Sequence, residues 1–150
     1  MNDLLCSNPL IKGMQDAGVR LTAQRIAIAQ WLHHSGQHPT SREVHAAMLE
    51  YHPTMSLATV YNTLSLLVEL DLIHEVGSIE DGSMRYEPNN SPHINLVCKG
   101  CGTILDDFAF DMSAVKASAA AHNFAVHDAS ITVHGLCEAC ATQQGDISHE

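Results

Sequence analysis

The segment SLATVYNTLSLLVEL, residues 56–70, gives the clearest evidence for the fold of the first half of the chain. Its apolar residues recur at spacings of three and four, as on one face of a helix that Ser56 caps. These residues are Leu57, Val60, Leu64, Leu67 and Val68. Any amphipathic helix has such a stripe, so the stripe by itself says nothing about function. The opposite face is more informative. It holds short or planar hydrogen-bonding groups suited to base edges, thymine methyls and phosphates: Ser56, Thr59, Tyr61, Asn62 and Thr63.

Three more helices are predicted before this one. They cover residues 9–17, residues 22–35 with Thr22 as the cap, and a stretch from the capping box Thr40–Glu43 to about Glu50. After the last helix, two short strands near residues 73–76 and 84–87 flank the turn-forming SIEDGS. Helices followed by such a hairpin predict a winged helix-turn-helix over residues 1–87, whose last helix would enter the major groove of DNA.

The pattern changes after the run PNNSP, which predicts a linker at residues 88–92. From residue 93 to 150, short β runs (INLVC, TILDDF, SITVHGLC) surround one Ala-rich helix, MSAVKASAAAHNF. The expected fold class is therefore α+β: an N-terminal winged helix-turn-helix followed by a small α/β domain.

Four of the five cysteines form two C-x-x-C pairs, Cys98 with Cys101 and Cys137 with Cys140. Two such knuckles complete a tetrahedral shell of soft anionic sulfurs with no open position, which suits structural Zn²⁺. The 35 residues between the knuckles can form strand, helix and strand, and zinc would stabilise this small unit. The alternative, a redox-active dithiol, would need one C-x-x-C pair beside a strand-to-helix turn and not two matched pairs. The fifth cysteine, Cys6, is expected to be an incidental free thiol.

The composition, 45% hydrophobic and 16% charged, is typical of a folded protein. The N-terminus has no basic run before an apolar core and no segment approaches about 18 uninterrupted apolar residues, so we expect neither a signal peptide nor a membrane span, and a cytoplasmic location. The net charge of −10 speaks against nucleic-acid binding, and even residues 1–87, with five basic and ten acidic residues, carry −5. It favours an alternative, a zinc-ribbon protein-interaction module. The sequence has no H-E-x-x-H motif, so a zinc hydrolase, and enzymatic activity in general, is not expected.

Eleven histidines are many for this length, and most are expected at the surface. Four residues at the predicted domain junction differ: His38, Glu87, His93 and Asp106. Two imidazoles and two carboxylates make a mixed nitrogen and oxygen shell for Fe²⁺, Mn²⁺ or Zn²⁺. One ion there would tie both domains together.

Five stretches together resemble the ferric uptake regulator (Fur) superfamily. They are GVRLTAQR (18–25), HPT (38–40), SLATVYNTL (56–64), PHINLVCKGCG (92–102) and GLCEAC (135–140). The resemblance covers roughly residues 10–140 in the right order. HPT is weak by itself, whereas S-x-A-T-V-Y followed by both C-x-x-C pairs is specific.

The resemblance implies a metal-dependent transcriptional repressor that binds double-stranded operator DNA and forms a homodimer through its C-terminal domain. It implies structural zinc on the four cysteines and places Arg20 at the DNA backbone or minor groove and Tyr61 at bases. The regulatory ligands it implies are His38, Glu87, His93, Asn95 and Asp106, with Asn95 standing where the family has the second histidine of an H-x-H motif. A further ligand set of the family is incomplete here, because Pro92 and Ile94 replace a histidine and an aspartate; His127 and His134 are candidate substitutes, although strand packing explains them as easily.

Asp106 and a single regulatory site resemble the peroxide-responsive (PerR-type) branch. In that branch, bound iron reacts with peroxide and oxidises a ligand histidine, here His38 or His93. The alternative is a zinc- or iron-uptake regulator without peroxide sensing. In either case the ion would favour a closed dimer whose two recognition helices fit successive major grooves.

Overall fold

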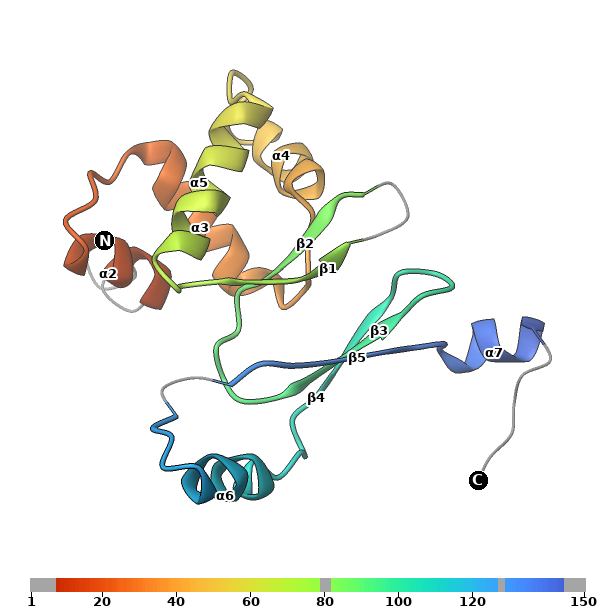
Figure 1. The fold of residues 1–150 in the computed structure, drawn as a ribbon. Helices are drawn as coiled ribbons and strands as arrows, with labels where there is room; N and C mark the ends of the chain where they lie inside the picture. The colour runs from red at the N-terminus through yellow and green to blue at the C-terminus, as the bar shows by residue number, and fades with distance from the viewer. Residues whose placement is uncertain (1–7, 79–81, 127–128, 145–150) are drawn as a thin grey trace. The chain divides into compact units, whose positions relative to one another are not determined.

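The computed structural model describes residues 8–78, 82–126 and 129–144. The chain divides between Asn90 and Ser91 into two compact units, called unit 1 and unit 2 from here on. Figure 1 shows the elements of each. The boundaries expected at residues 87 and 93 remain a prediction.

Unit 1 contains the four helices that the sequence predicts: α2 (Pro9–Asp16), α3 (Ala23–Ser35), α4 (Ser41–Leu49) and α5 (Leu57–Glu69). Three of their N-caps are the expected residues. Thr22 accepts a hydrogen bond from the Arg25 backbone N–H, and Ser56 accepts one from that of Thr59. Thr40 forms a full capping box, since the Glu43 side chain also accepts from the Thr40 N–H.

The apolar faces of these helices form one continuous core. Its largest fully buried side chains include Ile28, Leu64 and Leu67, each with no measurable exposure. The apolar stripe of α5 is not buried along its whole length, because Leu57 is 38% exposed in the first turn. One sequence assignment for α5 was wrong. Thr63, placed on the polar face, is buried, and its hydroxyl donates to the Thr59 carbonyl four residues earlier, which satisfies it inside the core.

The predicted wing is an antiparallel pair, β1 (His74–Ser78) and β2 (Met84–Glu87). Part of the expected turn, residues 79–81, lies outside the described residues. The start of β2 is also tied to the loop before α4, because Thr40 and Arg85 form an isolated bridge and the Tyr86 N–H donates to the Pro39 carbonyl. Backbone hydrogen bonds therefore fix the position of the wing relative to this loop.

Unit 2 is a three-stranded sheet with strand order β4-β3-β5. β4 (Ile104–Asp107) runs antiparallel to β3 (Ile94–Cys98), and β5 (Ile131–Gly135) runs parallel to it. The crossover from β4 to β5 contains α6 (Ser113–Ala121), the expected Ala-rich helix. The short helix α7 (Glu138–Gln144) was not predicted, because EACATQQ has no apolar period. The α+β class is confirmed.

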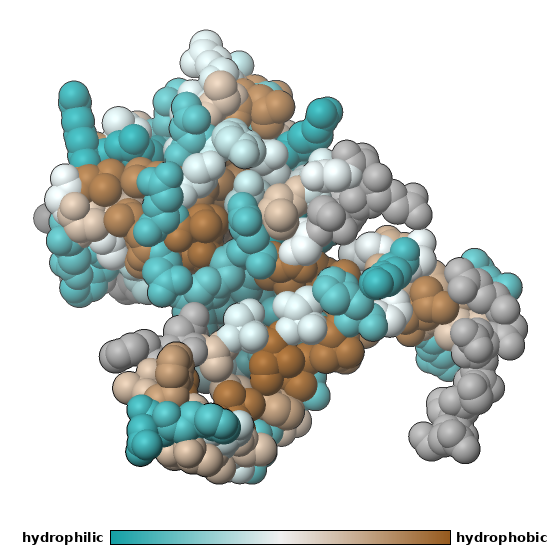
Figure 2. Space-filling model, in the orientation of Figure 1, coloured by the Kyte–Doolittle hydropathy of each residue, from teal (hydrophilic) through white to brown (hydrophobic). Residues whose placement is uncertain are grey.

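One face of the sheet in unit 2 carries exposed apolar side chains. Leu96 lies opposite Leu105 on β4 and Val133 on β5, so all three share this face. They are 39%, 53% and 46% exposed, and hydrophobic side chains cover this part of the surface in Figure 2. A hollow of about 210 Å³ lies on the same face and reaches Leu136. Among the described residues, no helix has the length and apolar character to cross a membrane.

Candidate functional site

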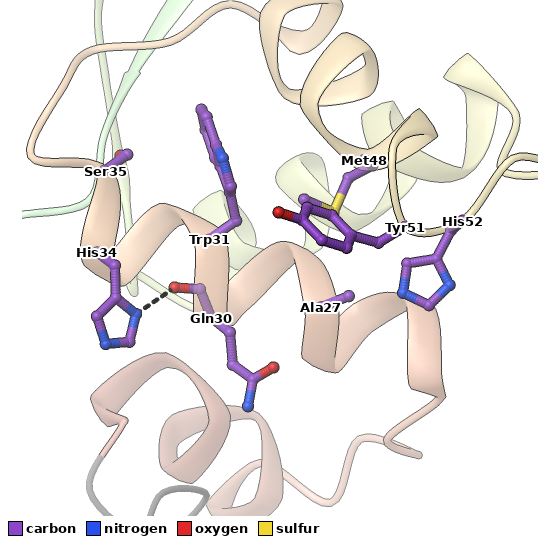
Figure 3. A pocket seen from close by; sticks show the side chains of 8 residues that line it. All are labelled: Ala27, Gln30, Trp31, His34, Ser35, Met48, Tyr51 and His52. Atoms are coloured by element: carbon purple, nitrogen blue, oxygen red, sulfur yellow. Dashed lines mark hydrogen bonds between the residues drawn. The ribbon is translucent and has the colours of Figure 1, made fainter.

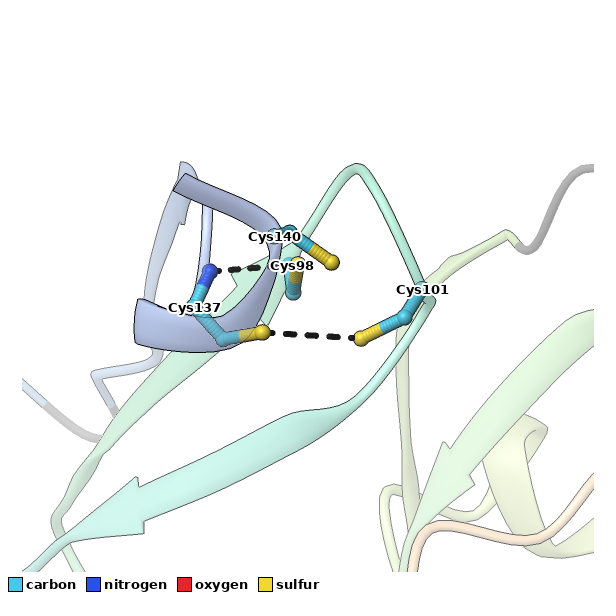
Figure 4. A group of neighbouring side chains, drawn as sticks. All are labelled: Cys98, Cys101, Cys137 and Cys140. Atoms are coloured by element: carbon cyan, nitrogen blue, oxygen red, sulfur yellow. Dashed lines mark hydrogen bonds between the residues drawn. The ribbon is translucent and has the colours of Figure 1, made fainter. Parts of the chain in front are cut away.

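The structure brings the four cysteines of the two knuckles together within unit 2. Cys98 ends β3, Cys101 lies in the turn after it, Cys137 precedes α7 and Cys140 lies in its first turn. Their sulfur atoms all lie within 4.8 Å of one another, and Figure 4 shows them facing a common centre. Four sulfurs in one cluster match the tetrahedral shell of a structural zinc site.

Backbone groups prepare Cys98 to be a thiolate. Its Sγ accepts from the N–H of Cys137 at 3.2 Å and from that of Gly100 at 3.3 Å. These hydrogen bonds, that of Cys137 foremost, lower the pKa of the Cys98 thiol to about 6. The Thr103 hydroxyl does the same for Cys101, whose pKa is also lowered.

Cys140 shows the opposite effect. The neighbouring sulfurs, Cys137 first and then Cys98 and Cys101, raise the pKa of its thiol to about 12. Without a metal, the protein therefore favours the thiolate forms of Cys98 and Cys101 and disfavours that of Cys140. A divalent cation at the centre would reverse this by compensating the charge of all four sulfurs, so the donor set fits zinc.

Gly100 is required by the close approach of the two knuckles. A Cβ at this position would lie 2.8 Å from the Cys140 sulfur and 2.9 Å from the Cys140 Cβ. Any larger residue would push the α7 knuckle away. The glycine in C-x-G-C is therefore a structural part of the cluster.

A second set of ligand-type side chains begins in unit 1 with His38 and Glu87. His38 lies in the loop between α3 and α4, and Glu87 ends β2. The His38 Nε2 and Glu87 Oε2 are 2.5 Å apart, and the two residues are only 9% and 3% exposed. The second carboxylate oxygen of Glu87 accepts from the Asn89 N–H. The two residues are 49 positions apart in the sequence, so their contact is a feature of the tertiary structure.

Arg85 holds the His38 loop in place. Its guanidinium donates to the His38 carbonyl at 2.6 Å and lies 3.5 Å from the carboxylate of Glu43, the residue that completes the α4 capping box. One side chain thus links the wing, the His38 loop and the start of α4. Sequence reasoning missed Arg85, since a basic residue in a strand carries no motif.

Unit 2 contains the other candidate ligands. His93 directly precedes β3, and its side chain and that of Asn95 lie on the same face because strand side chains alternate. Asp106 is directly opposite Asn95 in the β3–β4 register. The nearest ligand atoms of His93 and Asp106 lie within 4.8 Å of each other. His93 Nδ1 is 2.7 Å from the Ser91 carbonyl, and its ring stacks on Phe108 at 4.9 Å. The Ser91 contact fixes the ring tautomer so that Nε2 can be a metal ligand.

The candidate DNA-binding residues have different surroundings. Tyr61 is 57% exposed on α5, and Asn62 and Arg20 are exposed as well. Thr59 is half-buried, and the exposed Ser56 already uses its hydroxyl as the α5 cap. Tyr61, Asn62 and Arg20 are thus the more accessible candidates.

Two candidate residues of unit 2 have other outcomes. His134 is exposed on β5, where it pairs with Val97 in register. His127 lies outside the described residues, as does Cys6.

A hollow of about 450 Å³ opens on unit 1 beside α3 and the end of α4 (Figure 3). Trp31, Met48 and Tyr51 supply its apolar part, and His34 and His52 lie toward its two ends. His34 is occupied, since its Nδ1 is 2.7 Å from the Gln30 carbonyl. The lining residues include neither a carboxylate nor a thiol, so His34 and His52 are its only common metal-ligand side chains, fewer than the three or four protein ligands of a zinc site.

The chain is similar to known proteins in sequence and in structure. The sequence profile of the Ferric uptake regulator family matches residues 16–134. The peroxide operon regulator of Bacillus subtilis is 33% identical over 136 residues, which cover 89% of this chain and 92% of that protein. The ferric uptake regulator of Vibrio cholerae has a similar structure, with a TM-score of 0.65, 25% identity and coverage of 84% and 98%. That of Pseudomonas aeruginosa with manganese shares the fold, at a TM-score of 0.71, 23% identity and coverage of 85% and 96%.

Proposed function

Because the chain belongs to the ferric uptake regulator family and is a metal-dependent transcription regulator rather than an enzyme, we propose that it represses genes by binding operator DNA as a homodimer when a regulatory ion is bound. The observation that carries this proposal is the buried His38–Glu87 pair. A buried imidazole and carboxylate, fixed by a neighbouring arginine at the edge of a winged helix, form half of a metal site. We place the protein in the cytoplasm, with its DNA.

The regulatory ligands in this proposal are His38 and Glu87 from unit 1 and His93, Asn95 and Asp106 from unit 2. Each half has its own support: the short His38–Glu87 contact in unit 1, and the shared face of His93, Asn95 and Asp106 in unit 2. Two neutral imidazoles and two carboxylates balance the charge of a divalent ion. Since the ligands come from both units, binding the ion would favour one arrangement of the units, which gates DNA binding.

The four cysteines have a separate role in the proposal. They hold a structural Zn²⁺ that stays bound whether or not the regulatory site is filled. All four come from unit 2, so this zinc stabilises that unit without depending on unit 1.

Dimerisation is proposed for the apolar sheet face of unit 2. Leu96, Leu105 and Val133 are exposed together there, and a second copy of the chain would cover them. In the described sheet β5 is an outer strand, with β3 on one side, so its other edge is available for pairing.

Operator contact is proposed for α5 and for Arg20. Tyr61→Ala should weaken binding to the protein's own upstream DNA by about 1–3 kcal/mol, because one exposed contact to bases or thymine methyls is lost. Zinc content should not change, since Tyr61 lies in unit 1. A fluorescence-anisotropy titration at fixed salt with Mn²⁺ measures this, and Gln15→Ala on the exposed face of α2 is the control. Equal operator affinity in Tyr61→Ala and the parent would contradict the role of α5.

The signal in this proposal is peroxide, because the relatives at 33% identity include a peroxide operon regulator. Iron in the regulatory site would supply the reaction with peroxide. The chain supplies His38 and His93 as the nearest oxidisable side chains, and their oxidation would weaken the site. Anaerobic iron-loaded protein treated with peroxide should lose operator binding and gain oxygen on a peptide containing His38 or His93. Mn²⁺-loaded protein is the control. Loss of binding on metal removal, without any response to peroxide, would favour a plain iron, zinc or manganese sensor.

A further inference from the structure

Asn95 holds a buried oxygen that the chain itself does not satisfy. The residue lies in β3 and is 2% exposed. Among the described residues, its Oδ1 is one of two buried side-chain polar atoms without a hydrogen-bond partner, the other being Arg85 Nε. Leaving such a group unpaired destabilises the folded state, because the oxygen gives up water and gains no partner. This buried amide oxygen therefore lacks the partner that would offset its desolvation.

The neighbours of Asn95 in unit 2 are both metal-ligand types. Asp106 lies directly across the β3–β4 ladder, and His93 lies two residues earlier on the same face. Because His93 Nδ1 lies 2.7 Å from the Ser91 carbonyl, His93 would bind an ion through Nε2. The ligand types on this face of the sheet are thus one imidazole nitrogen, one carboxylate and one neutral amide oxygen, and of these the amide oxygen of Asn95 has no hydrogen-bond partner.

We propose that Asn95 Oδ1 is a ligand of the regulatory ion and that it shifts the preference of the site away from Zn²⁺ and toward Mn²⁺ or Fe²⁺. The inference rests on the proposed regulatory site. With an imidazole at position 95, the site would have three nitrogen donors and two oxygen donors. With the amide oxygen of Asn95, the proposed site has two nitrogen donors and three oxygen donors. Oxygen donors suit Mn²⁺, whereas imidazole suits zinc and the later transition metals. Almost any protein site binds Zn²⁺ more tightly than Mn²⁺ or Fe²⁺. The effect of Asn95 is therefore to reduce the ratio of Zn²⁺ affinity to Mn²⁺ or Fe²⁺ affinity.

The test measures Mn²⁺ and Zn²⁺ affinities of the full-length protein with the four-cysteine zinc in place. Free Mn²⁺ is followed by electron paramagnetic resonance, and Zn²⁺ by competition with a chelator. Changes around a metal site typically alter affinity about 10- to 100-fold, and a direct ligand should do at least as much. Asn95→His should therefore raise the ratio of Zn²⁺ to Mn²⁺ affinity about tenfold or more. An unchanged ratio would overturn the inference.

A second variant separates ligation from packing. Asn95→Leu has nearly the same size but no donor, so the protein without a regulatory ion should melt at the same or a higher temperature. The rise in melting temperature that saturating Mn²⁺ gives the parent should be lost in this variant. A structural amide would give the opposite pattern, with a less stable apo state and unchanged Mn²⁺ affinity, and would refute the proposal.

His38→Ala shows which proposal has failed. If it abolishes binding of the regulatory Mn²⁺ while Asn95→Leu leaves it intact, the regulatory site stands and only the role of Asn95 is wrong. If His38→Ala leaves Mn²⁺ affinity unchanged, the proposed regulatory site itself is wrong.

Discussion

Unit 1 buries fourteen hydrophobic side chains in one core, whereas Val97 and Cys98 are the buried hydrophobic residues among those described in unit 2. The difference is not one of secondary structure, since both units have well-formed helices and strands. In unit 2, α6 has no buried residue and apolar side chains face outward from the sheet. Unit 1 is thus stabilised by apolar burial, whereas the proposed zinc and the proposed dimer partner would stabilise unit 2.

Removal of one thiolate should change the protein most. Cys98→Ser should eliminate the structural zinc, and with it a binding free energy on the order of 10–16 kcal/mol. Amide protons of β3 and β5 should then lose protection from exchange, while those of α3 and α5 keep it. Hydrogen exchange read by mass spectrometry, with zinc quantified by atomic absorption, measures both. Cys6→Ser is the matched control and should retain zinc. Protection retained in β3 without zinc would break the contrast between the units.

A cavity in the core should act on unit 1. Leu64→Ala removes a fully buried side chain and should cost about 2–5 kcal/mol of the free energy of unfolding. Leu57→Ala, on the same helix but 38% exposed, should cost much less. Urea unfolding followed by the single tryptophan, Trp31 of α3, measures the stability of this unit. An equal decrease in the free energy of unfolding for the two variants would show that Leu57 belongs to the core as much as Leu64 does.

A charge on the apolar sheet face should disrupt the dimer. Leu105→Asp would bury an unpaired carboxylate in the proposed interface and should weaken self-association by about 1–3 kcal/mol or more. Sedimentation velocity at several concentrations measures this, with zinc content as a check on folding. Leu49→Asp, which changes an exposed leucine of α4 in unit 1, is the control. An unaltered dimer would place the interface elsewhere.

The smallest effect is expected at a helix cap. Thr40→Ala removes the side-chain acceptor of the α4 capping box and should destabilise unit 1 by about 1 kcal/mol. The exchange protection of unit 2 should stay the same. Urea midpoints compared with those of Thr54→Ala, an exposed turn residue, measure the difference. A larger effect on β3 than on α4 would show that the two units are not independent in stability.

The helices of unit 1 could be predicted because their signals are local. Thr22, Thr40 and Ser56 each act within three residues of their own position. Thr63 was misassigned because its burial depends on a hydrogen bond to its own helix, which hydropathy does not reveal. Helix α7 was missed because its position is set by the knuckle that it carries and not by an apolar stripe.

The four-cysteine cluster could be predicted because C-x-x-C spacing fixes the geometry of each pair within one turn. The second set of ligands depends on tertiary structure. His38 meets Glu87 across 49 residues, and only the hairpin and the bridge between Thr40 and Arg85 bring them together. Arg85 and the unsatisfied oxygen of Asn95 had no sequence signal, since both follow from burial.

The parallel pairing of β3 with β5 has a consequence for biosynthesis. Cys98 and Cys137 are 39 residues apart, so a ribosome adding about 5–20 residues per second separates the two knuckles by roughly 2–8 s. Unit 1 can fold during translation, while the two thiols of the first knuckle wait for the second pair and can meet stray metals and oxidants. In cells short of zinc, newly made chains should therefore accumulate with unit 1 folded and unit 2 unfolded. Proteases would cleave such chains in unit 2 first.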